Sequence, residues 1–509
     1  MRSPADLLPE LARRHGDRRA LVTQARTLTF AELDQLSAVV ASALAAEGLV
    51  GGERVSLYAE NRWEWLVAYH GILRAGLVVN PLNGMLTPPE VAYVSDDCQV
   101  AAIIGSASRL QALTAHGTPR TVRTLIAFDD PPPGCQSFDE ALGRGLVATG
   151  PPPDIDPGAL GSIGYTSGTT GHPKGAMQPH RAVLLNAALT ATMHGRSAAD
   201  VMLTALPAPH VYGNAAIHAT LLAGGTVVLQ ERFDAGAALE LVERHRVTMI
   251  EGVPTMYAAL LAHEDAERRD LHTLTRCTVG GQTMPVDVMT AWEQRSGAPL
   301  IELWGMTEIA GLGTTHAIHA PRLLGSIGVS LPGVELRVAS LDDPTVALGP
   351  DEPGELLVRG PIVMLGYWAN AEATSAVLDD QGWLRTGDVA TVDETGHYFI
   401  VDRHKDMLIT AGYNVYPAEI ERVIAKHPAV SMVAVGKVPD VAKGELACAY
   451  IVLRPGREAT EQEIVDHCRT QLAAYKVPRS VHFVEDLPKT STGKILRRKL
   501  SVPAQEVSA

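Results

Sequence analysis

The sequence predicts an α/β fold, with a large N-terminal layered α/β domain and a small C-terminal α+β domain. The chain has 509 residues, which is too long for a single hydrophobic core. Strand and helix patterns alternate over roughly the first 400 residues, as in mainly parallel sheets covered by helices. After Asp402 we expect only short helices and strands, and charge rises toward a basic end. The predicted domains are therefore residues 1–401 and 402–509.

The N-terminal domain begins with two predicted amphipathic helices, residues 5–15 and 31–47, whose apolar residues recur at helical spacing. Thr29 is a suitable N-cap for the second helix, and Glu32, three residues later, would complete a capping box. The strand at 78–81 is expected to end in a turn. The elements that follow the two helices are a strand at 55–58, a helix at 63–75, and strands at 78–81, 101–105 and 124–128.

Two proline-rich segments, residues 131–134 and 150–158, are predicted to be connectors. The second connector leads into the stretch Tyr165–Gly175. Sequence compatible with a helix follows from Ala182 to Met193. The predicted order around this stretch is therefore strand, loop, helix.

The composition excludes one class of function. Hydrophobic residues make up 46% of the chain and charged residues 20%, the balance of an ordinary globular protein. The net charge of −14 argues against general nucleic-acid binding, because that function needs a basic surface. A small anionic ligand held by local loops is compatible with this charge.

The cysteines and the hydropathy pattern predict a cytoplasmic protein. The five cysteines contain no Cys-x-x-Cys pair, so we expect reduced thiols. The N-terminus shows no signal peptide. The most apolar stretches, such as 221–229, are much shorter than the roughly 18 residues of a membrane span, so we expect no integral membrane segment.

The stretch YTSGTTGHPKG, Tyr165–Gly175, is the strongest candidate for a ligand-binding loop. Its glycines let backbone N–H groups turn toward a ligand, its hydroxyl groups add donors, and Lys174 adds a positive charge. Such a loop suits a polyphosphate. It is not a Walker A loop, because Gly-x-x-x-x-Gly-Lys-Ser/Thr cannot be placed here. The alternative is a flexible polar surface loop.

Four further motifs follow this loop along the chain. They are ELWGMTE ending at Glu308, TGD at 386–388, DRHKDMLITAGYN at 402–414 and PKTSTGK ending at Lys494. In order and separation the set resembles the adenylate-forming superfamily, which contains acyl-CoA synthetases, luciferases and nonribosomal adenylation domains. The resemblance extends over about residues 20–500. It implies activation of a small-molecule carboxylic acid by ATP and Mg²⁺, followed by transfer to CoA.

The resemblance assigns residues to the triphosphate and the metal ion. Thr307 would hydrogen-bond the α-phosphate, and Glu308 would hold Mg²⁺, a hard cation that prefers oxygen ligands. A solvated loop carboxylate is the alternative for Glu308. The residues that match the family's phosphate loop are Thr166, Ser167, Gly168, Thr169, Thr170, Gly171 and Lys174.

Other matching positions would bind the nucleoside. Asp388 would accept the ribose hydroxyls, although an Asp in a glycine turn is often just a turn residue, and Arg403 would add a second ribose contact. Trp304 stands where the family usually has tyrosine and would stack on adenine. The segment that lines the adenine and acyl pockets matches Gly280, Gly281 and Gln282.

The resemblance also implies a mobile C-terminal domain. Lys494 would reach the attacking carboxylate and the α-phosphate, where an ammonium offsets the repulsion between two anions. Asp402 matches the hinge about which this domain rotates between the two half-reactions, and Gly412 would line the pantetheine channel. The alternatives are a solvated tail lysine and a plain turn glycine. Three residues after Lys494 are expected to be solvated: Arg497, Arg498 and Lys499.

The predicted acyl pocket is apolar. His210 would gate the acid or assist the thiol, with a packed structural histidine as the alternative. No Asp closely follows Tyr212 to hold an α-ammonium group, which disfavours an amino acid. The pocket candidates are Tyr212, Gly213, Asn214, Met256, Gly281, Met306, Ile309, Gly311 and Leu312. They include no Arg or Lys for a second carboxylate, and the glycines at 213, 281 and 311 are expected to leave room for a chain or a ring.

The sequence therefore predicts an acyl-CoA synthetase that acts on a hydrophobic monocarboxylic acid. A medium- or long-chain fatty acid is favoured, and an aryl or arylpropenoic acid is the second choice. Two alternatives remain: a ligase that loads a carrier protein, and a non-enzymatic nucleotide-binding protein. A homodimer is possible.

Overall fold

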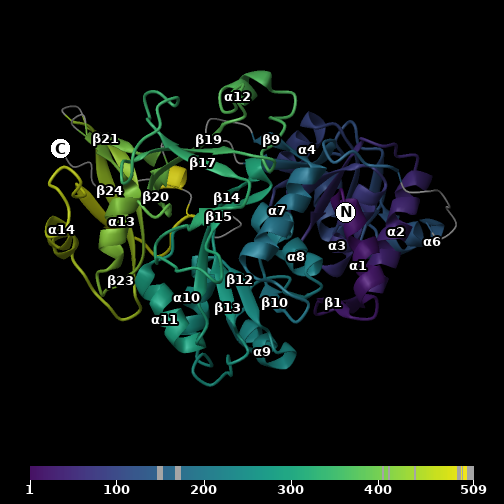
Figure 1. The fold of residues 1–509 in the computed structure, drawn as a ribbon, viewed down its shortest axis with the longest axis horizontal. Helices are drawn as coiled ribbons and strands as arrows, with labels where there is room; N and C mark the ends of the chain where they lie inside the picture. The colour runs from purple at the N-terminus through teal and green to yellow at the C-terminus, as the bar shows by residue number, and fades with distance from the viewer. Residues whose placement is uncertain are drawn as a thin grey trace. The chain divides into compact units, whose positions relative to one another are not determined.

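The computed structural model (Figure 1) describes residues 1–145, 153–166, 173–403, 406–410, 413–440, 443–489, 495 and 497–500. The chain divides into two compact units. The first unit contains Met1–Glu335 and Val358–Leu384, and the second contains Leu336–Leu357 and Arg385–Ala509. The predicted fold class is confirmed, because the fold is mixed α/β with a large N-terminal and a smaller C-terminal domain. A boundary between residues 401 and 402 stays a prediction.

One sheet of the first unit ends in the two strands that flank the predicted phosphate loop. Its strand order is β7-β6-β5-β3-β4-β8-β9. Neighbouring strands are parallel, except that β8 and β9 are antiparallel. Its strands are β3 (Arg54–Ala59), β4 (Val78–Asn83), β5 (Val100–Gly105), β6 (Thr124–Ala127), β7 (Gln136–Ser137), β8 (Leu160–Thr166) and β9 (Lys174–Pro179).

A second sheet of this unit has the order β16-β15-β14-β13-β12-β10-β11-β1-β2. Its central strands, from β14 to β1, are parallel, and the pairs at both edges are antiparallel. The strands are β1 (Arg19–Val22), β2 (Thr27–Thr29), β10 (Val201–Thr204), β11 (Thr226–Leu229), β12 (Met249–Gly252), β13 (Arg276–Val279), β14 (Leu300–Met306), β15 (Gly311–Thr315) and β16 (Val329–Ser330).

Helices cover both faces of the second sheet. Alternate side chains of its strands point to opposite faces, so neighbouring residues of one strand pack against different helices. Met202 and Met249 pack in one hydrophobic cluster with residues of α8 (Val211–Leu222). Their sequence neighbours Leu203 and Ile250 pack in another cluster. That cluster also includes residues of α9 (Ala235–His245), α10 (Pro254–Ala262) and α11 (Val286–Ser296). Figure 1 shows α10 and α11 on one side of β12 and β13, and α8 on the other.

The predicted capping box at the second helix is confirmed. Thr29 Oγ1 accepts a hydrogen bond from the Glu32 backbone N–H at 3.2 Å, and Glu32 Oε2 accepts one from the Thr29 N–H at 2.8 Å. The remaining helices of this unit are η1 (Pro4–Asp6), α1 (Leu7–His15), α2 (Phe30–Ala46), α3 (Trp63–Arg74), α4 (Pro88–Asp97), α5 (Ala107–His116), α6 (Phe138–Gly145), α7 (His180–Met193), η2 (Thr307–Ile309) and α12 (Ala371–Ser375).

The second unit contains a sheet of order β17-β18-β19-β20 and a sheet in which β22, β21, β24 and β23 are neighbours and β25 pairs with β24. The prediction of short elements after Asp402 is wrong, because β23 has 11 residues and β24 has 10. Both strands are long because they pair along their length and bury alternate residues in one core. The elements are β17 (Glu335–Ala339), β18 (Gly354–Arg359), β19 (Leu384–Val392), β20 (Tyr398–Arg403), β21 (Leu408–Thr410), β22 (Tyr413–Val415), α13 (Pro417–Ala425), β23 (Val430–Asp440), β24 (Gly444–Leu453), α14 (Glu461–Arg469), β25 (Ser480–Phe483) and η4 (Arg497–Lys499).

The strand predicted at 78–81 does end in a turn, but the turn begins after Asn83, with the Leu86 N–H donating to the Asn83 backbone oxygen at 3.0 Å. The strand continues as β4 to Asn83, which pairs with Ala59 of β3. Proline removes one N–H donor from a strand but tolerates the extended backbone, so the pairing with β3 persists.

All five cysteines lie in described parts of the chain and are free. Among the described residues, no helix has the length and hydropathy needed to cross a bilayer.

Candidate active site

The candidate site in the first unit lies where neighbouring parallel strands end. The strands β14, β13, β12 and β10 are adjacent and parallel, so their carboxyl ends meet at one edge of the sheet. Ligands bind at this edge in open α/β sheets. The segments that follow these strands carry residues assigned from separate motifs: Thr307 after β14, Gly281 after β13, Met256 after β12 and His210 after β10.

Strands β8 and β9 hold the two ends of the predicted phosphate loop side by side. Thr166, the last residue of β8, pairs with Lys174, the first residue of β9. Five loop residues that the sequence assigned to phosphate lie outside the described residues: Ser167, Gly168, Thr169, Thr170 and Gly171. The antiparallel pairing therefore fixes the base from which the predicted loop extends.

The turn η2 places Thr307 directly against these two strands. Nε2 of Gln178, on β9, donates a hydrogen bond to the backbone oxygen of Thr307 at 2.8 Å. A Cβ atom at Gly164, on β8, would lie 2.6 Å from Cγ2 of Thr307, which explains why glycine is needed there. The structure thus brings two motifs, far apart in the sequence, into contact.

Glu308 is largely buried and has a specific partner. Only 7% of the surface of Glu308 is exposed, and its Oε1 accepts a hydrogen bond from the hydroxyl of Tyr367 at 2.8 Å. Burial, and then the nearby carboxylate, raise the pKa of Tyr367, so this hydroxyl keeps its proton and donates. Nζ of Lys174 lies 5.3 Å from the centroid of the Tyr367 ring, within the range of a cation–π contact.

Tyr367 was missed by sequence reasoning, although the segment that carries it is tightly bound to the site. The Met364 N–H donates to the backbone oxygen of Glu308 at 2.8 Å, and the Trp368 N–H donates to that of Gly175 at 2.8 Å. Tyr367 also forms an antiparallel bridge with Ala176 of β9. The sequence signal is only the pair Gly366-Tyr367, which is too common to indicate a site.

The residues assigned to adenine lie at the same edge of the second sheet. Trp304 is 8% exposed and lies on β14, where it packs over Gly313, whose Cβ would approach the Trp304 ring to 2.5 Å. Gly281 follows β13 with a φ of +85° and precedes Gln282. A left-handed backbone conformation favours glycine, so the local backbone by itself explains why glycine occupies position 281.

Two glycines of the predicted acyl pocket do not leave the room that the sequence suggested. A Cβ at Gly213 would lie 2.4 Å from the backbone oxygen of Pro207, and a Cβ at Gly311 would lie 2.4 Å from Oδ1 of Asn186. The chain itself fills these spaces. At Gly281 the nearest atom, Cγ1 of Val253, would lie 3.5 Å away. Among these three positions, the lack of a side chain therefore leaves open space only at Gly281.

The segment His210–Asn214 is held by hydrogen bonds at the start of α8. His210 is the N-cap residue, and its Nδ1 accepts from the Tyr212 N–H at 3.3 Å. Nδ2 of Asn214 donates to the backbone oxygen of Ala208 at 3.4 Å. The Tyr212 hydroxyl lies 2.8 Å from Oγ1 of Thr278 and is buried. Met306, at the end of β14, pairs with Gly311 of β15.

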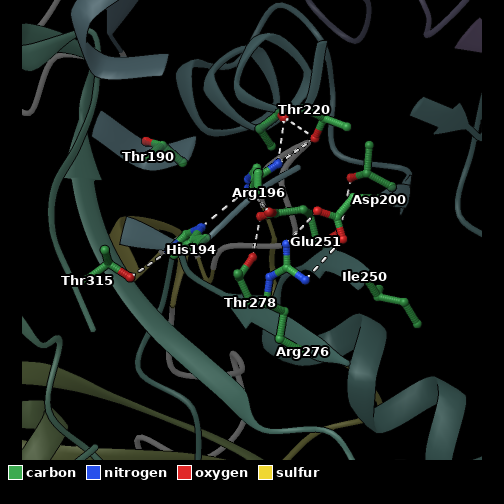
Figure 2. A network of polar contacts seen from close by, with 12 residues as sticks. Thr190, His194, Arg196, Asp200, Thr220, Ile250, Glu251, Arg276, Thr278 and Thr315 are labelled. Atoms are coloured by element: carbon green, nitrogen blue, oxygen red, sulfur yellow. Dashed lines mark hydrogen bonds and ion pairs between the residues drawn. The ribbon is translucent and has the colours of Figure 1, made fainter. Parts of the chain in front are cut away.

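Tyr212 of this segment contacts Thr278, which belongs to a buried polar network drawn in Figure 2. Arg196 and Glu251 form an ion pair in which both side chains are fully buried. Thr278 donates its hydroxyl hydrogen to Glu251 and contacts the hydroxyl of Tyr212, whose pKa is raised by burial and by Glu251. His194 joins the network through Arg196, at 3.4 Å. The segment His210–Asn214 is therefore connected, through Tyr212 and Thr278, to a buried ion pair.

In the second unit, the two residues assigned to ribose form an ion pair. Nε of Arg403 lies 2.9 Å from Oδ1 of Asp388, and the residues pair across β19 and β20. The Asp388 N–H donates to Oγ1 of Thr386 at 3.1 Å. Asp388 is 4% exposed, so it is a fixed carboxylate.

Asp402 is also buried, with 3% of its residue surface exposed. Its carboxylate accepts hydrogen bonds from the N–H groups of Arg403 and Ala418, each at 2.7 Å. It also contacts Arg497. The expectation that Arg497 is solvated is wrong, because this side chain is drawn into a cluster of three carboxylates. Lys499 is exposed, as expected, while Gly412, Lys494 and the side chain of Arg498 lie outside the described part of the chain.

Comparison with known proteins agrees with this geometry. The model of the AMP-binding enzyme family matches residues 8–368, and the model of the AMP-binding enzyme C-terminal domain matches residues 419–494. A long-chain-fatty-acid–CoA ligase of Bacillus subtilis is 33% identical over 97% of this chain and 93% of its own length. A feruloyl-CoA synthase of Amycolatopsis is 37% identical over 92% of each protein. The solved structure of the anthranilate CoA ligase AuaEII with anthranoyl-AMP has a TM-score of 0.91, 30% identity, and coverage of 97% of this chain and 96% of its own.

These matches span nearly the whole chain and join the motifs to one fold. The non-enzymatic alternative is overturned, because the family models are those of AMP-binding enzymes and the curated relatives include CoA ligases. The chain belongs to the AMP-binding enzyme family, in its AMP-forming acyl-CoA ligase branch, whose reaction uses ATP, Mg²⁺ and CoA.

Proposed function

We propose that this enzyme activates a hydrophobic monocarboxylic acid, with a medium- or long-chain fatty acid as the first choice. The acid and ATP give acyl-AMP and pyrophosphate, and acyl-AMP and CoA then give acyl-CoA and AMP. The observation that carries the proposal is the convergence of Lys174, Thr307 and Glu308 at the paired strands β8 and β9. This is where a triphosphate and an attacking carboxylate need their charges offset.

In the first half-reaction, each group has a separate task. The phosphate loop and Lys174 bind the β- and γ-phosphates, and the Thr307 hydroxyl donates to the α-phosphate. Glu308 offers carboxylate oxygen to Mg²⁺, which fits the hard-ligand preference of that ion. The metal ion, when bound, offsets negative charge on the phosphates. Lys494 approaches the acid and the α-phosphate as the bond to phosphorus forms and pyrophosphate leaves.

The remaining assignments concern the nucleoside and the second half-reaction. Asp388 accepts the ribose hydroxyls beside Arg403, while Trp304 stacks on adenine near Gly281 and Gln282. Rotation of the residues after the hinge Asp402 replaces Lys494 with the segment around Gly412, beside which pantetheine enters. His210 gates the acid or assists the approach of the thiol.

The substrate class is supported by the apolar character of the residues predicted to line the acyl pocket. Met256, Ile309 and Leu312 are buried, and the candidate positions include no lysine or arginine for a second carboxylate. Two relatives, one named for long-chain fatty acids and one for feruloyl-CoA, support an aliphatic and an arylpropenoic substrate respectively. An aryl or arylpropenoic acid is the second candidate, and the feruloyl-CoA synthase relative, at 37% identity, supports it.

A screen of acids for AMP release that depends on both ATP and CoA would test the proposal. It should compare fatty acids of increasing chain length, cinnamic and benzoic acids, and short dicarboxylic acids. We expect the highest kcat/KM with a fatty acid of medium or long chain. A preference for cinnamates would favour the second candidate, and a preference for a dicarboxylate would overturn the pocket argument. Reactions without CoA or without ATP serve as controls.

The same screen can distinguish the carrier-protein alternative. A ligase that loads a carrier should form a thioester with a purified acyl carrier protein and little or none with free CoA. We expect the opposite result. Absence of any acyl-CoA product, with acyl-AMP formed, would reject CoA as the acceptor while leaving the adenylation step intact.

A further inference from the structure

Arg497 lies at the centre of a carboxylate cluster in the second unit. Its Nη2 and Nε contact Oε2 and Oε1 of Glu421 at 2.7 and 3.2 Å, the fork geometry of a bidentate pair. Its Nη1 lies 3.1 Å from Oδ2 of Asp406 and 3.4 Å from Oδ1 of Asp402. Burial opposes the charge on Arg497, but the carboxylates outweigh burial and raise its pKa. The guanidinium therefore stays charged and bridges three separate segments.

Two of these carboxylates are themselves fixed to the fold of the C-terminal residues. Asp402 accepts a hydrogen bond from the N–H of Ala418, in the first turn of α13. Glu421, on the same helix, accepts one from the N–H of Val435 on β23 at 2.7 Å. The hinge carboxylate, α13 and β23 are thus one connected group, and Arg497 closes it.

The chain on both sides of Lys494 is anchored near this group. Lys489 and Ile495 form an antiparallel bridge, so the ends of the segment that includes Lys494 lie next to each other. Ile495 and Leu500 pack against the hydrophobic cluster that contains Ala434 and Tyr450. Arg497 lies between these two apolar anchors and only three residues after Lys494.

We propose that Arg497 is a positioning residue for adenylation, which fixes the segment carrying Lys494 to the hinge residue Asp402. This inference rests on the proposed function, in which Lys494 acts in the first half-reaction. Among the described residues, the polar contacts of Arg497 are to Asp402, Asp406 and Glu421. They are therefore kept if those residues rotate as one body. These contacts, which we call the Arg497 clasp (Arg497 with Asp402, Asp406 and Glu421), tie the chain three residues after Lys494 to those carboxylates.

A lysine at this position would not replace the arginine. Glu421 is held by two parallel hydrogen bonds from the planar guanidinium while Nη1 faces the two aspartates, and an ammonium on a flexible stem offers no such fork. Arg497→Lys should keep the charge that offsets the carboxylates but lose the geometry. The lysine variant therefore separates a role in charge balance from a role in position.

The test measures the two half-reactions of the full-length enzyme separately. Adenylation is followed as pyrophosphate release, with dodecanoate or cinnamate, whichever wild type activates faster. Thioester formation is followed from the matching preformed acyl-AMP and CoA. We expect Arg497→Met to slow adenylation by about 10²-fold, the effect of a misplacement of about 1 Å, while thioester formation stays near the wild-type rate. Arg497→Lys should give an intermediate loss of adenylation.

Arg497→Met leaves Asp402 without its cation, so the variant enzyme is at risk of unfolding. The double variant Arg497→Met/Glu421→Gln removes one negative charge as well and should show the same loss in adenylation with better stability. Arg469→Met, which removes an arginine paired with Asp466 on α14 of the same unit, is the matched control and should leave both half-reactions unchanged.

A second measurement does not depend on turnover. Hydrogen exchange in Arg497→Met should accelerate in peptides covering residues 400–407 and 489–500, but not in peptides from α14. Equal loss in both half-reactions, greater loss in thioester formation, or unchanged exchange in these peptides would overturn the proposal. Failure of wild type itself to release pyrophosphate with any acid would instead reject the proposed function, and the exchange result would still decide whether the clasp exists.

Discussion

The hydroxyl of Tyr367 donates a hydrogen bond to Oε1 of Glu308 at 2.8 Å. This contact joins the segment after β18 to the turn after β14, and Lys174 lies over the ring of the same tyrosine. The carboxylate that we assign to Mg²⁺ is therefore oriented by a residue that also touches the base of the phosphate loop.

Tyr367→Phe should raise the Mg²⁺ concentration needed for half-maximal pyrophosphate release by about tenfold. The variant keeps the ring that faces Lys174 and loses a hydrogen bond to a charged group, worth about 1.5 kcal/mol. Binding of Mn²⁺ with a non-hydrolysable ATP analogue, measured by calorimetry, should weaken in parallel. Tyr398→Phe, which loses a hydrogen bond to the backbone oxygen of Leu336, is the control. An unchanged metal requirement in Tyr367→Phe would remove Tyr367 from the site.

Lys494→Ala should slow adenylation by about 10²-fold or more, because one positioned cation between two anions is a large part of the electrostatic stabilisation of this step. Thioester formation from preformed acyl-AMP should be largely spared. Rapid-quench measurement of each half-reaction gives the two rates. A loss of the same size in both would contradict the assignment of Lys494 to the first half-reaction alone.

Asp402→Pro should have the reverse effect and slow thioester formation more than adenylation, because proline fixes the backbone torsion at the proposed hinge. Asp402→Asn is the matched variant, since it keeps an oxygen acceptor for the Ala418 N–H and leaves the backbone free. The comparison between the two variants isolates the torsion from the loss of the carboxylate. If Asp402→Asn reproduces the proline effect, the hinge role is not supported.

Breaking the buried pair of Arg196 and Glu251 from one side should be more harmful than removing it. Arg196→Met leaves Glu251 buried without its cation and should destabilise the protein by about 3–5 kcal/mol, whereas Arg196→Met/Glu251→Met should recover most of that loss. Thermal midpoints of the two variants and of Glu251→Met would show the coupling. The double variant should still raise KM for the acid, because Thr278 and Tyr212 lose the carboxylate that positions them. An additive loss of stability would contradict this account.

The stability of wild type should fall between about pH 5 and pH 8 through Glu302. Burial raises the pKa of this carboxyl to about 7, against the opposing hydrogen bond from the Gly325 N–H. The folded state therefore holds a proton that the unfolded state releases near pH 4.5, and its stabilising effect is complete at low pH and lost as pH rises through 7. The loss over this range is about 2–3 kcal/mol.

Glu302→Gln should not show this contribution, because glutamine keeps an acceptor for Gly325 and does not ionise. The thermal midpoint of the variant relative to wild type should therefore increase from pH 5 to pH 8. Glu293→Gln, at an arginine-paired carboxylate of α11, serves as a comparison. A difference between Glu302→Gln and wild type that does not change with pH would contradict the raised pKa.

The sequence by itself determined the fold class and the mainly parallel sheets, and it predicted a phosphate loop between the segments that form β8 and β9. Period-two and period-3.6 patterns are local, so the capping box of Thr29 and Glu32 and the helices around it were predictable from neighbouring residues. The roles of Thr307, Glu308 and Asp388 came from the resemblance to a family and not from local patterns, and they stay predictions. By contrast, the length of β23 and β24 depends on pairing between two strands, which no local pattern expresses.

The tertiary structure alone decided which side chains act on one another. Tyr367 contacts Glu308, and Arg497 contacts Asp402, across long stretches of chain, and neither partner can be found by spacing along the sequence. It also showed that Pro207 and Asn186 occupy the space where a side chain at Gly213 or Gly311 would lie. These two glycines therefore give no information about substrate size. The physical reason is that burial and pairing are properties of folded surfaces in contact, whereas composition and periodicity describe one segment at a time.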